Sequence, residues 1–230
     1  MRWIITAIIA LVAGFSGAAA WEYSGFGSER LRADLIADPE WLPEAMNEYQ
    51  ALQIAEQLAP LRPELETPYP GAVLGNPEGS ITLVEFTDYA CGYCRQSLPD
   101  VIALIADNPD LKVVVREYPI LSAGSADAAR MALAAADQGR FEEFHNAMFA
   151  QDGPSPEGIE AAAIAAGVDL AQARTAIEAG EFESQLQNNV FLGQTMRLGG
   201  TPSWIVGDQV MEGAVERSRL EAAVAEARDS

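Results

Sequence analysis

The chain has 230 residues, a hydrophobic fraction of 49% and a formal net charge of -20. This length and composition suffice for one domain with a buried core and a further segment. Lys112 is the single lysine, so the chain lacks the clustered basic residues that bind nucleic acid or anionic membrane surfaces, and we expect no nucleic-acid partner.

The first 20 residues have the pattern of an exported protein. Arg2 is followed by an apolar run over residues 3–20, which ends with Ala18 and Ala20 in the spacing of a signal-peptidase site. A run of this length also nearly matches a bilayer core, so the alternative is a retained membrane anchor. Both interpretations place the remainder outside the cytoplasmic membrane, where disulfides form and persist.

Residues 28–66 predict a helical arm. Ser28 is a candidate N-cap for a first helix, which Asp38-Pro39 ends, and a second helix is expected to begin with Pro43 as its first residue. One face of this second helix carries the apolar side chains of Ala45, Met46, Tyr49 and Leu52. Such an arm either packs on its own domain or associates with another copy of the chain, and residues 65–75 are expected to be a linker.

Residues 71–230 predict a second unit in which strands and helices alternate. The apolar, β-branched runs at 81–86 and 111–118 are expected to be buried strands, and the helical stretch between them makes the two strands parallel. Strands are also expected at 203–207 and 209–215, with a turn at Gly207-Asp208, followed by a helix from Ser218. This order predicts an α/β fold of the thioredoxin type with a helical insertion.

The helical insertion occupies the region between those two halves. Ser125 is expected to cap a helix that runs to Ala136, and residues 141–150, 169–179 and 181–197 continue with helical periodicity. Another helix is bounded by Ser155 as its N-cap and Gly167 as its stop.

Cys91 and Cys94 are the only cysteines, and three kinds of chemistry can be compared for them. A zinc site needs four ligands, whereas the chain adds one distant histidine, His145. A structural disulfide across two residues closes a very small loop and constrains little chain entropy. Where a strand gives way to a helix, in contrast, unpaired N–H groups and the helix dipole stabilise a thiolate. The motif therefore indicates redox chemistry, with Cys91 expected to be exposed at the helix start.

The stretches VEFTDYACGYCR and GGTPSWIVG, together with the helical insertion, resemble the DsbA-like thiol-disulfide oxidoreductases of the bacterial periplasm. The resemblance implies that Cys91 attacks and Cys94 resolves, that Thr201 and Pro202 form the substrate-binding turn with a cis peptide bond, and that no metal or organic cofactor is needed. It also implies a buried proton-relay acid at Glu85; the alternative is a carboxylate satisfied by the backbone or by Arg116.

Smaller features refine this expectation. Gly92 and Tyr93 are similar to the dipeptide of the isomerase DsbC and of the suppressor-of-copper-sensitivity (ScsC) proteins, which implies a less extreme oxidant than DsbA. Residues 35–46 resemble the N-terminal region of ScsC proteins, which implies a homo-oligomer. Tyr89 and Tyr93 are candidates for a peptide-binding surface, with plain packing as the alternative. His145 is expected to be a packing or surface residue, and Phe86 and Trp204 are expected to lie in the core.

The sequence thus predicts a periplasmic oxidoreductase or isomerase that exchanges disulfides in cysteine-containing exported proteins and is served by a membrane redox partner. The protein is expected to be soluble after signal cleavage or anchored to the inner membrane by residues 3–20. The alternative function is Cu(I) handling through the Cys91 and Cys94 thiolates. A further alternative is a non-catalytic envelope interaction module that uses the acidic arm.

Overall fold

The computed structural model describes residues 3, 14–17, 32, 36 and 42–229. The chain divides into two compact units, Met1–Gln50 and Ala51–Ser230. The expected signal or anchor segment and the first arm helix lie almost wholly outside the described residues. Within the described part, no helix is long and apolar enough to cross a membrane.

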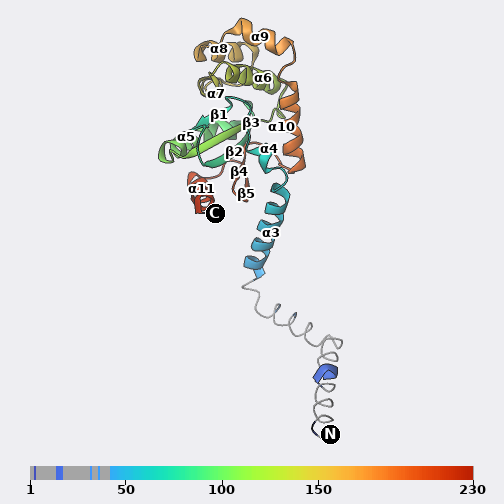
Figure 1. The fold of residues 1–230 in the computed structure, drawn as a ribbon. Coiled ribbons are helices and arrows are strands. Elements are labelled where there is room, and N and C mark those ends of the chain that lie inside the picture. Colours follow the sequence, from blue (N-terminus) through green and yellow to red (C-terminus); the bar gives the residue numbers. More distant parts are fainter. Residues whose placement is uncertain (1–2, 4–13, 18–31, 33–35, 37–41, 230) are drawn as a thin grey trace. The chain divides into compact units, whose positions relative to one another are not determined.

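A five-stranded sheet in the order β1-β3-β2-β4-β5 forms the centre of residues 51–230 (Figure 1). Strands β2 (Ile81–Thr87) and β3 (Leu111–Glu117) are parallel, as predicted, because α5 (Gly92–Asp107) connects them. Strand β4 (Ser203–Val206) pairs antiparallel with β2, and β5 (Gln209–Glu212) pairs antiparallel with β4. The two-residue turn at Gly207 and Asp208 was predicted, and Gly207 has the positive φ of 54° that favours glycine there.

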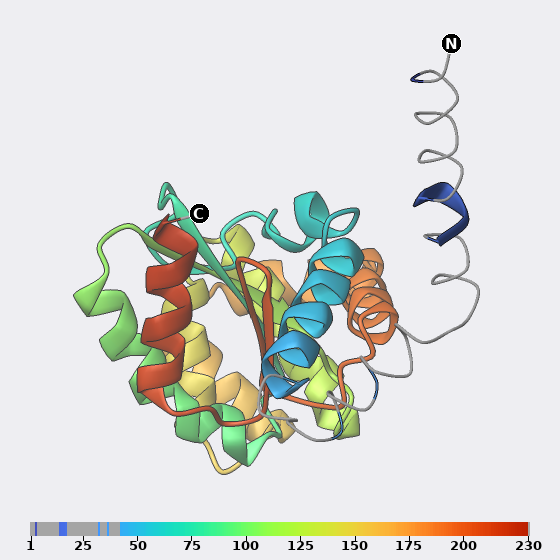
Figure 2. The same cartoon turned by 90° about the horizontal axis from the view of Figure 1, so that it is seen from below.

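The two faces of the sheet carry separate cores. Leu83, Val113 and Val115 face a large core shared with α5, with the helical insertion and with the last helix, α11 (Arg217–Asp229). Figure 2 shows α11, in red, beside α5. The opposite face belongs to a smaller core, whose buried members are Leu58, Leu65, Val84, Phe86, Val114, Tyr118, Leu192, Leu198 and Ile205. Successive residues of each strand thus face different cores, so polar side chains can contact each other only if they lie on the same face.

Helices follow the predicted order in the insertion. They are α6 (Ala123–Asp137), α7 (Phe141–Phe149), α8 (Pro156–Ala166), α9 (Leu170–Glu178) and α10 (Glu183–Thr195). The predicted cap of α6 is wrong: Ser122 is the N-cap, and Ser125 lies three residues later and closes a reciprocal capping box with it. Either serine satisfies the sequence pattern, and the box uses both hydroxyls. Ser155 and Gly167 bound α8 as expected.

The predicted linker contains a strand. Residues Val73–Gly75 form β1, which pairs antiparallel with β3 at the edge of the sheet. Before it, α3 (Leu42–Leu58) begins one residue earlier than predicted, and the short helix α4 (Arg62–Leu65) follows it with Pro63 in its first turn. Leu58 and Leu65 are fully buried in the smaller core, so the segment after residue 51 belongs to the domain.

Candidate active site

The candidate site begins where β2 ends. A four-residue loop leads from Thr87 to Gly92, and the Cys91 N–H donates to the Asp88 carbonyl at 2.9 Å. Asp88 also accepts from Ala90 N–H through Oδ1, and from Ile120 and Leu121 N–H through Oδ2, each at 2.8 to 2.9 Å. This buried aspartate therefore fastens the loop before the cysteines to the segment after β3, and sequence reasoning missed it.

Cys91 is the N-cap of α5, and its Sγ accepts the N–H of Cys94 at 3.4 Å. The contact is longer than an oxygen acceptor makes, which suits a sulfur atom at a helix start. Both cysteines are unpaired thiols. The prediction that Cys91 is exposed is wrong: its exposed fraction is 6%, against 1% for Cys94, because the loop of Thr201 covers the sulfur.

That loop connects α10 to β4. Thr201-Pro202 is a cis peptide, as the family resemblance implied, and the Cys91 thiol donates to the Thr201 carbonyl at 3.1 Å. The Pro202 carbonyl accepts the N–H of Gly213 at 2.8 Å, which ties the loop to the end of β5. Two segments that are 110 residues apart in the chain thus meet at Cys91.

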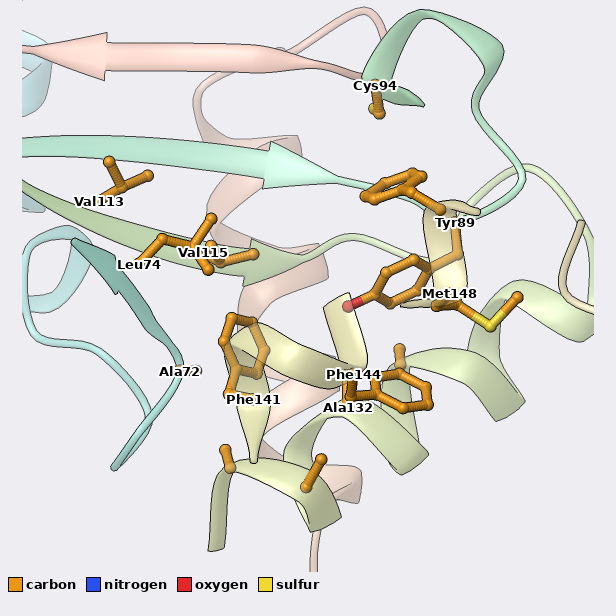
Figure 3. Packing of buried hydrophobic residues seen from close by; sticks show 14 of the residues in the cluster. Ala72, Leu74, Tyr89, Cys94, Val113, Val115, Ala132, Phe141, Phe144 and Met148 are labelled. Atoms are coloured by element: carbon orange, nitrogen blue, oxygen red, sulfur yellow. The ribbon is translucent and has the colours of Figure 1, made fainter. Parts of the chain in front are cut away.

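Tyr93 and Tyr89 have opposite environments. Tyr93 lies on the first turn of α5 with 64% of its side chain exposed, next to Cys94 in the chain. Tyr89 is buried among Phe144, His145 and Phe149, so its predicted place on a peptide-binding surface is wrong. In Figure 3, Tyr89 and Cys94 both border the core that contains Val113 and Val115.

Glu85 is buried on β2, on the same face as Leu83 and Cys94. Burial raises its pKa to about 8, and its Oε2 has no hydrogen-bond partner in the part of the chain that the structure describes. Burial also raises the pKa of the Cys94 thiol, and the charge of Glu85 raises it further. An acid with a pKa of about 8 exists in both protonation states near neutral pH, so its carboxylate can take the proton of this thiol and its acid form can return it.

Arg116 is not the partner of Glu85. It lies on the opposite face of β3, where its guanidinium donates to the carbonyls of Glu64, Leu65 and Thr67 and to Asn189 Oδ1. Burial lowers the pKa of Arg116 to about 10. The alternative in which Arg116 neutralises Glu85 is therefore wrong. Side chains alternate between the faces along each strand, and Arg116 pairs with Phe86, so it faces away from Glu85.

Tyr89, Glu117 and His145 form a second polar cluster, which sequence reasoning missed. The Tyr89 hydroxyl donates to Glu117 Oε1 at 3.0 Å and lies 3.1 Å from Nδ1 of His145. All three side chains are buried. His145 was predicted to be a packing or surface residue; it packs between Phe141 and Phe149, and it also has this polar contact. The sequence could have indicated the position of Glu117, because Val113, Val115 and Glu117 are two residues apart and therefore lie on the same face of β3.

Metal ligation has little support outside the cysteine pair. Within the described ranges there is no group of three or more histidine, cysteine, aspartate or glutamate side chains that could hold a metal ion.

The arrangement can be compared with known proteins. A thioredoxin-like oxidoreductase from Silicibacter pomeroyi DSS-3 is 42% identical, with a TM-score of 0.66 over 69% of this chain and 92% of its own. ScsC of Proteus mirabilis in a transitional conformation is 26% identical, with a TM-score of 0.65 over 91% of this chain and 95% of its own.

Curated relatives are much longer proteins. The Na(+)/H(+) antiporter NhaA 3 of Salinispora tropica is 30% identical over 155 residues, which are 66% of this chain and 24% of the antiporter. The chain spans about a quarter of the length of such relatives. A sequence model of the DSBA-like thioredoxin domain matches residues 82–225, which include both cysteines, Thr201 and Pro202. The chain therefore belongs to the family of DsbA-like thioredoxin domains.

Proposed function

We propose that the protein is a periplasmic thiol-disulfide oxidoreductase with isomerase activity, which exchanges disulfides in exported proteins through Cys91 and Cys94. The observation that supports this most directly is the position of the Cys91 thiol. It caps α5, accepts the Cys94 N–H, and points at the Thr201 carbonyl beside Pro202. An extended client can donate a hydrogen bond to that carbonyl in place of the Cys91 thiol, while a sulfur of the client bonds to Cys91.

The exchange runs in two steps. In the reduced protein the Cys91 thiolate attacks a client disulfide, a bond forms between Cys91 and one client sulfur, and the other client sulfur leaves with the electron pair. Cys94 then gives its proton to Glu85 and attacks Cys91. The bond between Cys91 and the client breaks, and the client sulfur leaves as a thiolate. In the oxidising direction a client thiolate attacks Cys91, and Glu85 returns the proton to the departing Cys94.

Client recognition is assigned to the surface around Cys91. Tyr93, Ile120 and Leu121 are exposed apolar side chains, and the last two lie in the segment after β3 that Asp88 fastens to the loop before the cysteines. Exposed apolar groups suit unfolded clients, which present apolar side chains of their own. Export rests on the pattern of residues 1–20, and a membrane redox partner that reoxidises the cysteines completes the proposed cycle.

The described part of α3 supports the assembly that the arm was predicted to make. Met46 and Leu52 are 53% and 64% exposed, and Leu42 is also exposed. We assign this apolar face to a second copy of the chain, which places several Cys91 thiolates around one client.

Two assays test the function. The wild-type protein should reduce insulin with dithiothreitol as electron donor and restore activity to scrambled ribonuclease; Cys91→Ser should abolish both activities. Cys94→Ser should retain mixed-disulfide formation but lose release of the client. A protein that binds Cu(I) tightly through both thiolates but fails both assays would support the copper-handling alternative instead.

A further inference from the structure

Glu85 is not the only buried acid on its face of the sheet. In the parallel pairing of β2 and β3, Glu85 lies opposite Val115, and Thr87 lies opposite Glu117. The two glutamates are therefore diagonal neighbours on one face, with Cα atoms roughly 8 Å apart from strand spacing and rise. Two glutamate side chains can span that separation, and both are nearly inaccessible to solvent.

The contacts of Glu117 determine which of its oxygens carries a hydrogen. Oε1 accepts the hydroxyl hydrogen of Tyr89, so a proton on Glu117 belongs on Oε2. That oxygen is buried without a partner among the described side chains, and so is Oε2 of Glu85. Burial raises the pKa of Glu117 well above its usual range, the hydrogen bond from Tyr89 lowers it, and the charges of Asp88 and Glu85 raise it. The net direction favours the protonated form of Glu117.

His145 completes the orientation of this acid. Burial lowers the pKa of its imidazole to about 3, so the ring is neutral. With the Tyr89 hydrogen donated to Glu117, we assign the hydrogen of His145 to Nδ1, so that the ring donates to the Tyr89 oxygen across the 3.1 Å contact. The chain of bonds from Nδ1 through the hydroxyl ends on Oε1 and leaves Oε2 of Glu117 as the free donor.

We propose that Glu85 and Glu117 act as an acid pair, in which Glu117 stays protonated and donates from Oε2 to the Glu85 carboxylate. This hydrogen bond stabilises the carboxylate form of Glu85, which is the form that can accept the proton of Cys94. This inference rests on the proposed role of Glu85 in the resolving step. Two neighbouring acids with different surroundings divide the roles: Glu85 exchanges its proton, and Glu117, held by Tyr89 and His145, keeps its own.

Among the described residues, the titratable groups around the pair come from several elements. Cys94 lies on the α5 side, Asp88 and Tyr89 lie on the loop after β2, and His145 lies on α7. Arg116, the basic residue on β3 beside Glu117, faces the other core. Besides the Thr87 hydroxyl, whose hydrogen bond lowers the pKa of Glu85, a protonated Glu117 is the neutral donor on this face that can stabilise a charge on Glu85.

Stopped-flow reaction of the reduced protein with Ellman's disulfide separates the relevant steps. The first release of thionitrobenzoate reports attack by Cys91, and the second reports resolution by Cys94. The second rate should rise with pH around the Glu85 titration near 8. Glu117→Leu removes the donor, so we expect that midpoint to move upward by about one unit, which slows resolution about tenfold at pH 7. Glu117→Gln, whose amide still donates, and Tyr89→Phe should shift it upward by less.

Val114→Ala is the matched control, because it removes buried volume from the opposite face of β3 and should leave the midpoint unchanged. The first release should keep its rate in all variants. A downward shift in both Glu117 variants would show a charged Glu117, and an unchanged midpoint in Glu117→Leu would show no coupling; either result overturns the pair. If Glu85→Gln keeps the wild-type pH profile of the second release, the proposed role of Glu85 fails, independently of Glu117.

Infrared spectra of the resting reduced protein test the pair without catalysis, and they remain informative if Glu117→Leu does not fold. At pH 7 the exposed carboxyl groups are ionised, so the carbonyl band of buried carboxylic acids should contain contributions from both glutamates. Glu85→Gln and Glu117→Gln should each remove part of this band, and Tyr89→Phe should move the Glu117 part to higher wavenumber because a hydrogen bond is lost. A Glu117→Gln spectrum that retains the whole wild-type band overturns the assignment.

Discussion

Glu85 and Arg116 lie on neighbouring strands but on opposite faces of the sheet. Arg116 pairs in register with Phe86, and its guanidinium binds backbone carbonyls near α4 and Asn189. Glu85 acts on Cys94, and no cation among the described residues lowers its pKa. Burial therefore raises the pKa of the acid of the active site, and the buried Arg116 binds elsewhere.

Stability should consequently depend on pH through Glu85. Its folded-state pKa of about 8 lies above the ordinary value of 4.5, so its stabilising contribution is complete below about pH 4.5 and is lost as the pH rises through 8. At about 1.36 kcal/mol per unit, the loss is on the order of 3 to 5 kcal/mol. Urea unfolding at pH 5 and pH 8 should show that Glu85→Gln becomes more stable relative to wild type by that order. A difference that is the same at both pH values contradicts this.

The buried cation should matter for the segment before β1. Arg116→Leu leaves the carbonyls of Glu64, Leu65 and Thr67 without their donor, which should cost about 3 kcal/mol of unfolding free energy. Arg116→Lys should rescue little, because one ammonium group cannot reach the same set of acceptors. Thermal unfolding and proteolysis between residues 59 and 70 measure the effect. Arg228→Ala is the control, since its ion pair with Asp110 is at the surface and should be worth under about 1 kcal/mol.

Much of this arrangement was predictable because it follows strand and helix periodicity. The runs at 81–86 and 111–118 are apolar except at Thr82, Glu85, Lys112, Arg116 and Glu117, and the cysteines fall between them, so the parallel unit was apparent. Strand β1 was missed because three residues are too few to show a period and are surrounded by proline and glycine. The direction of Tyr89 and the bond of Tyr89 to Glu117 depend on contacts 28 residues apart in the chain, which no local pattern contains.

The two thiols should differ strongly in reactivity. Both cysteines are buried, but Cys91 sits at the N-terminus of α5, whereas burial and the charge of Glu85 raise the pKa of the Cys94 thiol. In the reduced protein at pH 7, iodoacetamide should modify Cys91 at least about a hundredfold faster, because the thiolate is the reacting form. Mass spectrometry of the peptides measures both rates. In protein unfolded with urea the two cysteines should react at equal rates. Equal rates in the folded wild type as well would contradict the assignment of Cys91 as the attacking cysteine.

Tyr93 should tune the redox balance without being needed for exchange. Its exposed side chain lies on the first turn of α5, so Tyr93→His introduces a partly protonated ring near the Cys91 thiolate and should stabilise the reduced form. Equilibration with glutathione should show a reduction potential that is more oxidising by about 30 mV, a tenfold change in the equilibrium constant. Tyr93→Phe is the control for the loss of the hydroxyl. An equal shift in both variants would contradict the role of charge.

The last prediction concerns the arm and the choice between oxidase and isomerase. Met46 is exposed on the apolar face of α3, whereas Asn47 points about 100° away around the helix. If α3 associates copies of the chain, Met46→Asp should lower the mass measured by light scattering, whereas Asn47→Asp, with the same added charge, should not. Point variants are preferable to a chain that starts near Thr67, because that truncation removes Leu58 and Leu65 from the core.

The same variants test the functional link. An oligomer holds several Cys91 thiolates around one misfolded client and hinders the partner that would oxidise them, so dissociation should lower the isomerase rate and raise the rate of net oxidation. Refolding of scrambled ribonuclease measures the first rate, and oxidation of reduced ribonuclease measures the second. If wild type and Met46→Asp are both monomers, the association is wrong. If the mass falls while scrambled ribonuclease refolds at the wild-type rate, the arm assembles the protein but does not determine its activity.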